Sequence, residues 1–237
     1  MTHAGYRGHD WPDMSEYAVH FTKANGSNSP YKVMLSILHA GVLRPGPQPF
    51  GAARRFADQF LADPDLPTQY SVCFSEIPLG QLDRLVERRE SHYGIAFRHD
   101  FLARRGGSRV WYLDKGTQIA RSFDSMMGEY VNEDGKVRDG EIWQLTPFVD
   151  FPGTYGGADY RFEWEREWRK PGELRFKPDD VAYLFLPAAL HAKARRFFAD
   201  AAAGPEPYGP DYPCPYLDPT WDADQVSEAL YSGRNTS

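Results

Sequence analysis

Alternating charged and aromatic residues between positions 161 and 169 are the part of this chain best suited to chemistry. The segment reads Arg-Phe-Glu-Trp-Glu-Arg-Glu-Trp-Arg. In a β-strand, successive side chains point to opposite faces, so Glu163, Glu165 and Glu167 would share one face at a spacing of ~7 Å. Neighbouring carboxylates raise one another's pKa, and such clusters are typical of functional sites.

A helix is the alternative interpretation of the same segment. It would place Trp164 beside Trp168 and Glu165 beside Arg169, because residues four apart are neighbours on a helix surface. We favour the strand, since the run is short, rich in aromatic residues and bounded by Gly-Gly and Pro-Gly pairs.

A solvent-facing Glu-x-Glu pair on a strand can assist the cleavage of a glycosidic bond. One carboxylate hydrogen-bonds a ribose 2′-hydroxyl and stabilises the oxocarbenium-like state, while the other orients or deprotonates the acceptor. The structural alternative is a ladder of ion pairs in which the glutamates bind Arg161, Arg166 and Arg169 and contribute little. A single strand seldom supplies a complete set of metal ligands, so we expect no metal.

Two residues of the predicted strand 17–22 are candidates for binding a ligand. His20 and Thr22 lie two positions apart and so share a face of the strand. The imidazole of His20 could hydrogen-bond a ribose hydroxyl or act as an acid or base. A core histidine that is satisfied by a backbone carbonyl is the alternative.

Two further segments carry candidate residues at the ends of elements. Ser75 and Glu76 end the predicted strand 70–75, where functional residues often gather, although either side chain could instead cap the next helix. His92 and Tyr93 lie between a predicted helix and a predicted strand. For His92, a surface position at a helix C-terminus is the plainer interpretation.

Composition and motifs exclude several classes of protein. The net charge of −6 provides no bulk positive charge for coating nucleic acid, although paired arginines leave a local basic patch open. Two cysteines make neither a disulfide framework nor a zinc motif, and P-loop, Rossmann and G-x-S-x-G patterns are absent. No apolar run reaches the ~20 residues that cross a bilayer. We therefore expect a soluble cytoplasmic protein with no membrane partner.

The expected elements indicate a single α+β domain at 17–203. A loose N-terminal arm at 1–16 precedes this domain. A proline-rich tail with a short terminal helix, at 204–237, follows it. Strands are expected at 17–22, 70–75, 93–97, 110–113, 142–145, 161–169 and 181–186, and helices at 30–40, 51–62, 77–86 and 188–203. Strands outnumber helices and do not alternate with them. We therefore predict a mixed or antiparallel split sheet with flanking helices.

The order of motifs resembles the AbiGi family of abortive-infection phage-resistance proteins, from about Val19 to Pro187. The matching segments are His-Phe-Thr at 20–22, Ile-Leu-His-Ala-Gly at 37–41, Ser-Val-Cys-Phe-Ser-Glu-Ile-Pro-Leu at 71–79, His-Tyr-Gly-Ile-Ala-Phe at 92–97 and Glu-Arg-Glu-Trp-Arg at 165–169. Members of that family are described as the antitoxin of a two-gene phage-defence system. The resemblance thus implies a role in phage resistance and a cognate toxin or antitoxin protein as partner.

A second resemblance is to DarT-type DNA ADP-ribosyltransferases. It rests on His-Phe-Thr, the helix that follows, Gly-Val-Leu at 41–43, and a late glutamate followed by an apolar strand. It implies an ADP-ribosyltransferase-like fold with NAD as substrate and nucleic acid as one candidate acceptor. The same resemblance places His20 at the NAD ribose and Arg54 or Arg55 at the pyrophosphate, and it makes Glu167 the catalytic carboxylate.

Two functions of different classes follow. The first is an enzyme that binds NAD and transfers ADP-ribose, in which Glu165 assists the acceptor and Tyr70 or Tyr93 stacks on nicotinamide; Thr22 and Ser75 are further candidate contacts to the nucleotide. The second is a non-enzymatic antitoxin or binding module. Its glutamates form an acidic patch or pair internally, and its proline-rich tail becomes ordered on a partner.

Overall fold

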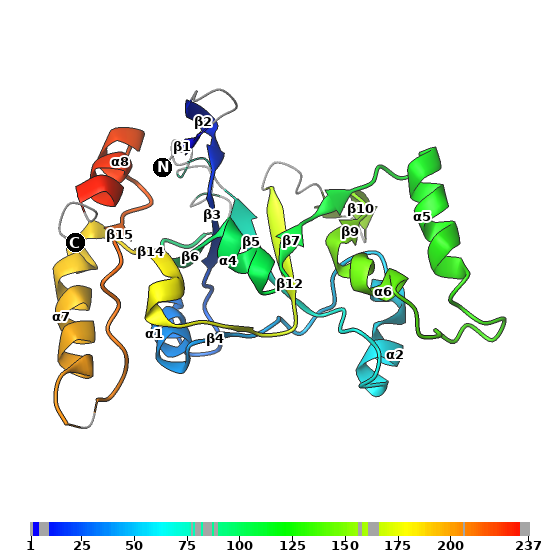
Figure 1. Cartoon of the computed structure of the whole chain (residues 1–237), viewed down its shortest axis with the longest axis horizontal. Helices are drawn as coiled ribbons and strands as arrows, with labels where there is room; N and C mark the ends of the chain where they lie inside the picture. The colour runs from blue at the N-terminus through cyan, green and yellow to red at the C-terminus, as the bar shows by residue number, and fades with distance from the viewer. Residues whose placement is uncertain are drawn as a thin grey trace. The chain divides into compact units, whose positions relative to one another are not determined.

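The computed structural model describes residues 2–4, 10–76, 78, 82, 87, 90–155, 158–160, 166–205 and 207–232. Contacts within the chain divide it into two compact units. The first unit comprises residues 1–43, 74–102 and 175–237, and the second comprises residues 44–73 and 103–174. The chain trace and its elements are drawn in Figure 1.

Seven strands form one mixed sheet in the order β15-β14-β6-β3-β5-β12-β7. Their bounds are β3 (Tyr17–Phe21), β5 (Ser71–Glu76), β6 (Gly94–Arg98), β7 (Ser108–Arg109), β12 (Glu167–Pro171), β14 (Val181–Phe185) and β15 (Tyr216–Leu217). The β14–β15 pair is parallel, whereas β3 pairs antiparallel with both β5 and β6. The predicted α+β class, with a mixed sheet and flanking helices, is confirmed.

The register of β3 assigns its side chains to two faces of the sheet. Val19 pairs with Ala96 and with Ser75, so these three side chains share one face. That face is the core of the first unit, a buried cluster of Tyr17, Val19, Leu82, Ala96, Tyr183, Phe185, Leu217, Val226 and Leu230. His20 pairs with Ile95 and points to the opposite face.

Helix α1 (Pro30–Ala40) begins and ends where its sequence predicts. The Ser29 hydroxyl accepts a hydrogen bond from Lys32 N, and Pro30 occupies the first turn, where no backbone donor is needed. Gly41 ends the helix in the left-handed conformation, with φ of 60°. Its N–H donates to Leu38 O at 3.3 Å, so the cap satisfies a carbonyl of the last turn.

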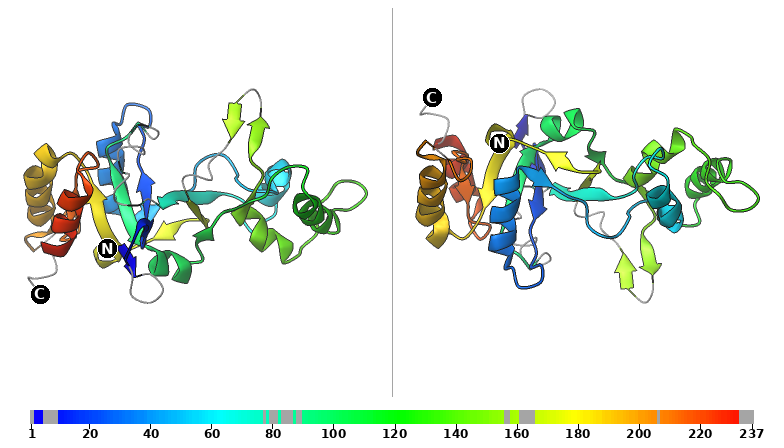
Figure 2. Two further views of the ribbon diagram at one scale, coloured as in Figure 1. Left: turned by 90° about the horizontal axis from the view of Figure 1, so that it is seen from above. Right: turned by 90° about the horizontal axis from the view of Figure 1, so that it is seen from below.

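The proline-rich segment that follows α7 (His191–Ala202) is part of the first unit. It contributes β15, and its buried Tyr212 donates from the hydroxyl to Leu38 O at 2.6 Å. Helices α7 and α8 (Ala223–Ser232) lie beside β14 and β15 in the views of Figure 2. Prolines keep the segment non-helical, as predicted, but its aromatic side chains anchor it by burial.

The N-terminal residues also differ from the predicted loose arm. Strands β1 (Thr2–Ala4) and β2 (Asp10–Ser15) form an antiparallel pair. Ser15 is buried, and its hydroxyl donates to Tyr17 O at 3.2 Å. This contact joins the end of β2 to the start of β3.

The second unit is built from short elements. Its helices are η2 (Arg54–Phe56), α2 (Ala57–Ala62), α5 (Gln118–Gly128), α6 (Ile142–Leu145) and η4 (Thr146–Phe148), and its further strands are β8 (Trp111–Tyr112), β9 (Val149–Asp150), β10 (Gly153–Tyr155) and β11 (Ala158–Tyr160). The remaining elements of the chain are β4 (Val42–Leu43), α4 (His99–Arg104), β13 (Leu174–Arg175), η6 (Pro178–Asp180) and η7 (Ala188–Leu190). Apolar residues of the second unit collect around the fully buried Trp143.

Helix α6 corrects the strand that the sequence predicts at 142–145. Trp143 donates from Nε1 to Arg138 O at 2.6 Å, and its ring packs edge-on against Phe56 and Phe60. A run of four residues, three of them apolar, fits either a helix or a strand, because periodicity cannot separate the two at that length. The tertiary contacts of Trp143 decide in favour of the helix.

Two predicted elements fall partly outside the described residues. Most of the predicted helix 77–86 does, although Leu82 is buried in the core of the first unit. Glu163 and Glu165 also lie outside, so only Glu167 of the glutamate row can be placed. Among the described residues, no helix has both the length and the apolar composition needed to cross a bilayer.

We expect Gly41→Ala to destabilise the chain by about 1–2 kcal/mol, the cost of a side chain in the left-handed conformation. A Cβ at this position would also lie 2.9 Å from Phe176 O. Gly46→Ala is the matched control, because a Cβ there meets nothing within 4 Å. Urea denaturation checks both variants, and equal stabilities would contradict the assigned role of Gly41.

Candidate functional site

The charged face of β12 lies inside the second unit. Glu167 and Arg169 are two residues apart and so point to the same face. Arg169 donates from Nε to Glu167 Oε1 at 2.9 Å and from a terminal nitrogen to Glu167 Oε2 at 3.0 Å. Trp168 points the other way and lies under the guanidinium of Arg109, 5.0 Å from the ring centroid. The strand alternation predicted for 167–169 is confirmed.

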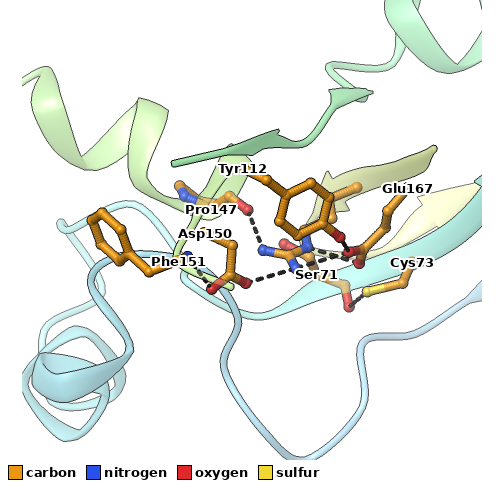
Figure 3. A network of polar contacts seen from close by, with 8 residues as sticks. Ser71, Cys73, Tyr112, Pro147, Asp150, Phe151 and Glu167 are labelled. Carbon is orange, nitrogen blue, oxygen red and sulfur yellow. Dashed lines mark hydrogen bonds and ion pairs between the residues drawn. The ribbon is translucent and has the colours of Figure 1, made fainter. Parts of the chain in front are cut away.

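Strands β8 and β9 bring two further polar groups to Arg169. Tyr112 pairs with Asp150 in this parallel ladder. The Tyr112 hydroxyl donates to Glu167 Oε2 at 2.5 Å, and Arg169 donates to Asp150 Oδ2 at 2.8 Å. We call these four residues the Arg169 cluster. Figure 3 shows Tyr112, Asp150, Glu167 and Pro147 gathered in this network, in which Arg169 also donates to Pro147 O at 3.0 Å.

The Arg169 cluster is buried, which corrects the prediction that the glutamate row faces solvent at Glu167. Arg169 is 0% exposed and Glu167 only 6%. Burial alone would lower the pKa of Arg169, but the adjacent Glu167 and Asp150 carboxylates raise it well above its ordinary value, so the guanidinium stays charged. Both carboxylate oxygens of Glu167 already accept hydrogen bonds, as the ion-pair alternative requires.

In the first unit, three predicted ligand contacts share one face of the sheet. His20 and Thr22 are two positions apart along the extended chain of β3, so their side chains point to the same face. The pairing with β6 continues past the end of β3, because Thr22 N donates to Tyr93 O at 3.0 Å. Tyr93 is two residues from Ile95, the partner of His20, so its side chain points to the same face. His20 is half-buried, and its ring meets Phe74 edge-on at 5.9 Å.

Tyr31 of α1 joins this group from outside the sheet. Its ring centroid lies 5.4 Å from that of Tyr93, at an interplanar angle of 37°. Burial, followed by the nearby Tyr93, raises the pKa of Tyr31, so the phenol is neutral at physiological pH. We call His20, Thr22, Tyr93 and Tyr31 the strand-end cluster. Sequence analysis missed Tyr31, although its place in the first turn of α1 was visible.

Ser75 is not part of the strand-end cluster. It pairs with Val19, is 1% exposed, and faces the apolar core on the side of the sheet opposite His20. The neighbouring Glu76 therefore points to the His20 face, where its buried carboxylate lies 3.5 Å from His99 Nε2. The pairing of Glu76 with His99 was missed, because the two residues are 23 positions apart and no motif of the sequence contains His99.

The other predicted cofactor contacts belong to the second unit. Arg54 and Arg55 form η2, and Arg55 makes an exposed ion pair with Asp124 at 3.0 Å. Tyr70 is half-buried just before β5, and its carbonyl accepts from Gly172 N at 2.8 Å.

Neither unit shows a metal centre in its described residues, since no three His, Cys, Asp or Glu side chains gather there in a suitable arrangement. The chemistry available is that of hydrogen bonding, ring stacking and proton transfer at His20. No family model, curated protein or solved structure matches this chain. The candidate sites therefore rest on the residues described above.

We expect Arg169→Met to destabilise the second unit by about 3–5 kcal/mol, because it leaves two buried carboxylates without their cation. Arg55→Ala removes an ion pair whose side chains are each 52% exposed, and we expect it to cost less than about 1 kcal/mol. Urea denaturation of both variants measures the difference. If Arg169→Met lowered the free energy of unfolding by less than Arg55→Ala does, the Arg169 cluster would contribute nothing to stability.

Proposed function

We propose that this chain is a phage-defence protein that binds NAD and transfers ADP-ribose to an acceptor. The observation that supports this most is the shared face of His20, Thr22 and Tyr93 at the end of β3. The proposal also draws on the resemblance of the His-Phe-Thr and Arg-Glu-Trp-Arg segments to phage-defence and ADP-ribosyltransferase families.

Each member of the strand-end cluster has a distinct task in this proposal. His20 hydrogen-bonds a ribose hydroxyl, with its ring held by the edge-on contact with Phe74. Tyr93 and Tyr31 offer neighbouring ring faces for the nicotinamide. The Thr22 hydroxyl donates to Pro30 O at 2.9 Å, so its task is to fix the strand end beside Tyr93.

The proposed reaction breaks the bond between ribose C1′ and the nicotinamide nitrogen. Nicotinamide leaves with the bonding electrons, an acceptor nucleophile bonds to C1′, and the acceptor loses a proton. Positive charge develops on the ribose in the transition state, and a nearby carboxylate stabilises that charge. Glu167 and Glu165 remain the carboxylates that we propose for this task and for assisting the acceptor.

The engagement of Glu167 favours a second candidate function, that of a non-enzymatic antitoxin or binding module. Both of its oxygens are bound by Arg169 and Tyr112, which is a structural use of the carboxylate. The second unit also exposes large apolar side chains, including Trp111 and Leu145, which are 52% and 55% exposed. A partner protein could cover such side chains.

Calorimetric titration with NAD tests the enzyme proposal. We expect the wild type to bind and His20→Ala to bind about tenfold more weakly, the loss of one hydrogen bond to the ribose. Tyr93→Ala should weaken binding by a similar factor through lost stacking. His39→Ala is the matched control, since His39 is an exposed histidine of α1 and has no task in the proposal.

Glu167→Gln needs a separate treatment, because removing its charge from the Arg169 cluster also costs stability. Its turnover should be compared with that of Asp150→Asn, which weakens the same cluster without touching the proposed carboxylate. Loss of turnover in Glu167→Gln alone supports the enzyme. Absence of NAD binding by the folded wild type would exclude it and leave the binding module.

A further inference from the structure

A cavity in the first unit has the features of an anion site. It has a volume of about 460 Å³ and lies between α7, α8 and the segment 213–216. The residues of interest that line it are His191 and Arg195 of α7 and Tyr216 of β15. None of the described lining residues carries a carboxylate. The strand-end cluster contributes no residue to this cavity.

Arg195 is held rigidly with its charge uncompensated. It donates to Tyr212 O at 3.0 Å and to Cys214 O at 2.8 Å, and its guanidinium lies 3.8 Å over the Tyr216 ring. These contacts use two of the five N–H donors of the side chain and leave three for a ligand. No carboxylate forms an ion pair with Arg195 in the described part of the chain.

The nearest acidic groups do not neutralise this guanidinium by contact. Burial raises the pKa of Cys214 to about 12, so the thiol is neutral at physiological pH. Asp211 accepts from Tyr212 N, and Asp218 accepts from Ala188 N and from Thr220. Both carboxylates hydrogen-bond nearby backbone N–H groups, and neither is among the described lining residues. Asp218 also interacts electrostatically with His191.

His191 supplies a second polar group with a defined tautomer. Its Nε2 lies 2.8 Å from Leu186 O. A carbonyl oxygen only accepts hydrogen bonds, so Nε2 carries the proton. In the neutral ring Nδ1 is an acceptor and suits a hydroxyl of the ligand, whereas in the imidazolium Nδ1 donates and suits a phosphate oxygen. The ring is fixed edge-on against Tyr216 and Trp221, at 6.0 and 5.3 Å. The cavity thus combines a fixed cation with a fixed imidazole.

We propose that this cavity binds the phosphoryl group of a small phosphate ester, with Arg195 as the principal donor. A planar guanidinium fork matches pairs of phosphate oxygens, and a rigid, pre-positioned fork loses little entropy on binding. A volume of about 460 Å³ exceeds what a bare phosphate ion needs and lies within the range of small-molecule sites. The proposal goes beyond NAD binding at the strand-end cluster and does not depend on it.

Calorimetry with adenosine 5′-monophosphate, inorganic phosphate and adenosine tests this proposal on the full chain. The wild type should bind the monophosphate, bind inorganic phosphate more weakly and show no heat with adenosine. Arg195→Gln should weaken binding of the monophosphate by at least about tenfold, the loss of a charge-assisted hydrogen bond. Arg196→Gln is the matched control, because the exposed Arg196 pairs only with Asp200, at 3.7 Å, and does not line the cavity.

Arg195→Lys is a second variant for the case that Arg195→Gln does not fold. It keeps the positive charge but loses the planar array of N–H donors and the stacking over Tyr216. We expect it to melt near the wild-type temperature and to bind with an intermediate affinity.

Wild-type affinity in Arg195→Gln, equal binding of adenosine, or no binding by the wild type would each overturn the phosphoryl site. Equal affinity for inorganic phosphate and the monophosphate would overturn the ester as ligand. His20→Ala should leave all of these titrations unchanged.

Discussion

The buried guanidinium of Arg169 is the constraint around which the second unit is organised. A charge removed from water must be met by opposite charge and by hydrogen bonds, and here these come from three places in the chain. Glu167 lies on the same strand, Asp150 on β9, and Pro147 in the η4 turn. Tyr112 on β8 acts through Glu167, to which its hydroxyl donates. Because every partner must be in place together, the cluster fixes the register of β8 against β9 and the path of the turn that joins α6 to β9.

This constraint changes the meaning of the most conspicuous segment of the sequence. An alternating Glu and Arg pattern is typical of a solvated sheet face, where ion pairs contribute little. Glu167 and Arg169 follow the same pattern but are buried. Removing one partner of a buried ion pair lowers the free energy of unfolding far more than it does at the surface. The preceding Arg166 adopts a positive φ of 46°, so the chain enters β12 through a conformation that few residues other than glycine favour. Any catalytic use of Glu167 must therefore coexist with a structural one.

Sequence patterns predicted the first unit better than the second, for physical reasons. Ser29, Pro30 and Gly41 determine α1 through local hydrogen bonds and backbone preferences, so three residues suffice to place both ends. The apolar run at 181–186 likewise predicts the buried strand β14, which lies between β15 and β6. Residues 142–145 gave the wrong element because the contacts of Trp143, not local preference, select the helix. Asp150 could not be predicted as a partner of Arg169, nor Tyr112 as a partner of Glu167, since nothing in their sequence neighbourhood marks them.

The candidate site was predictable to a similar extent. The two-residue spacing along β3 places His20 and Thr22 on one face. Only the pairing of β3 with β6 adds Tyr93 to that face, and only the pairing of β3 with β5 places Ser75 on the other. We propose that the strand-end cluster binds NAD. Hydrogen–deuterium exchange of the whole chain with and without saturating NAD tests it most directly. We predict slower exchange at the backbone amides of residues 20–22 and 93–95 when NAD is present. Unchanged exchange in both segments, or protection confined to other parts of the chain, would contradict the claim.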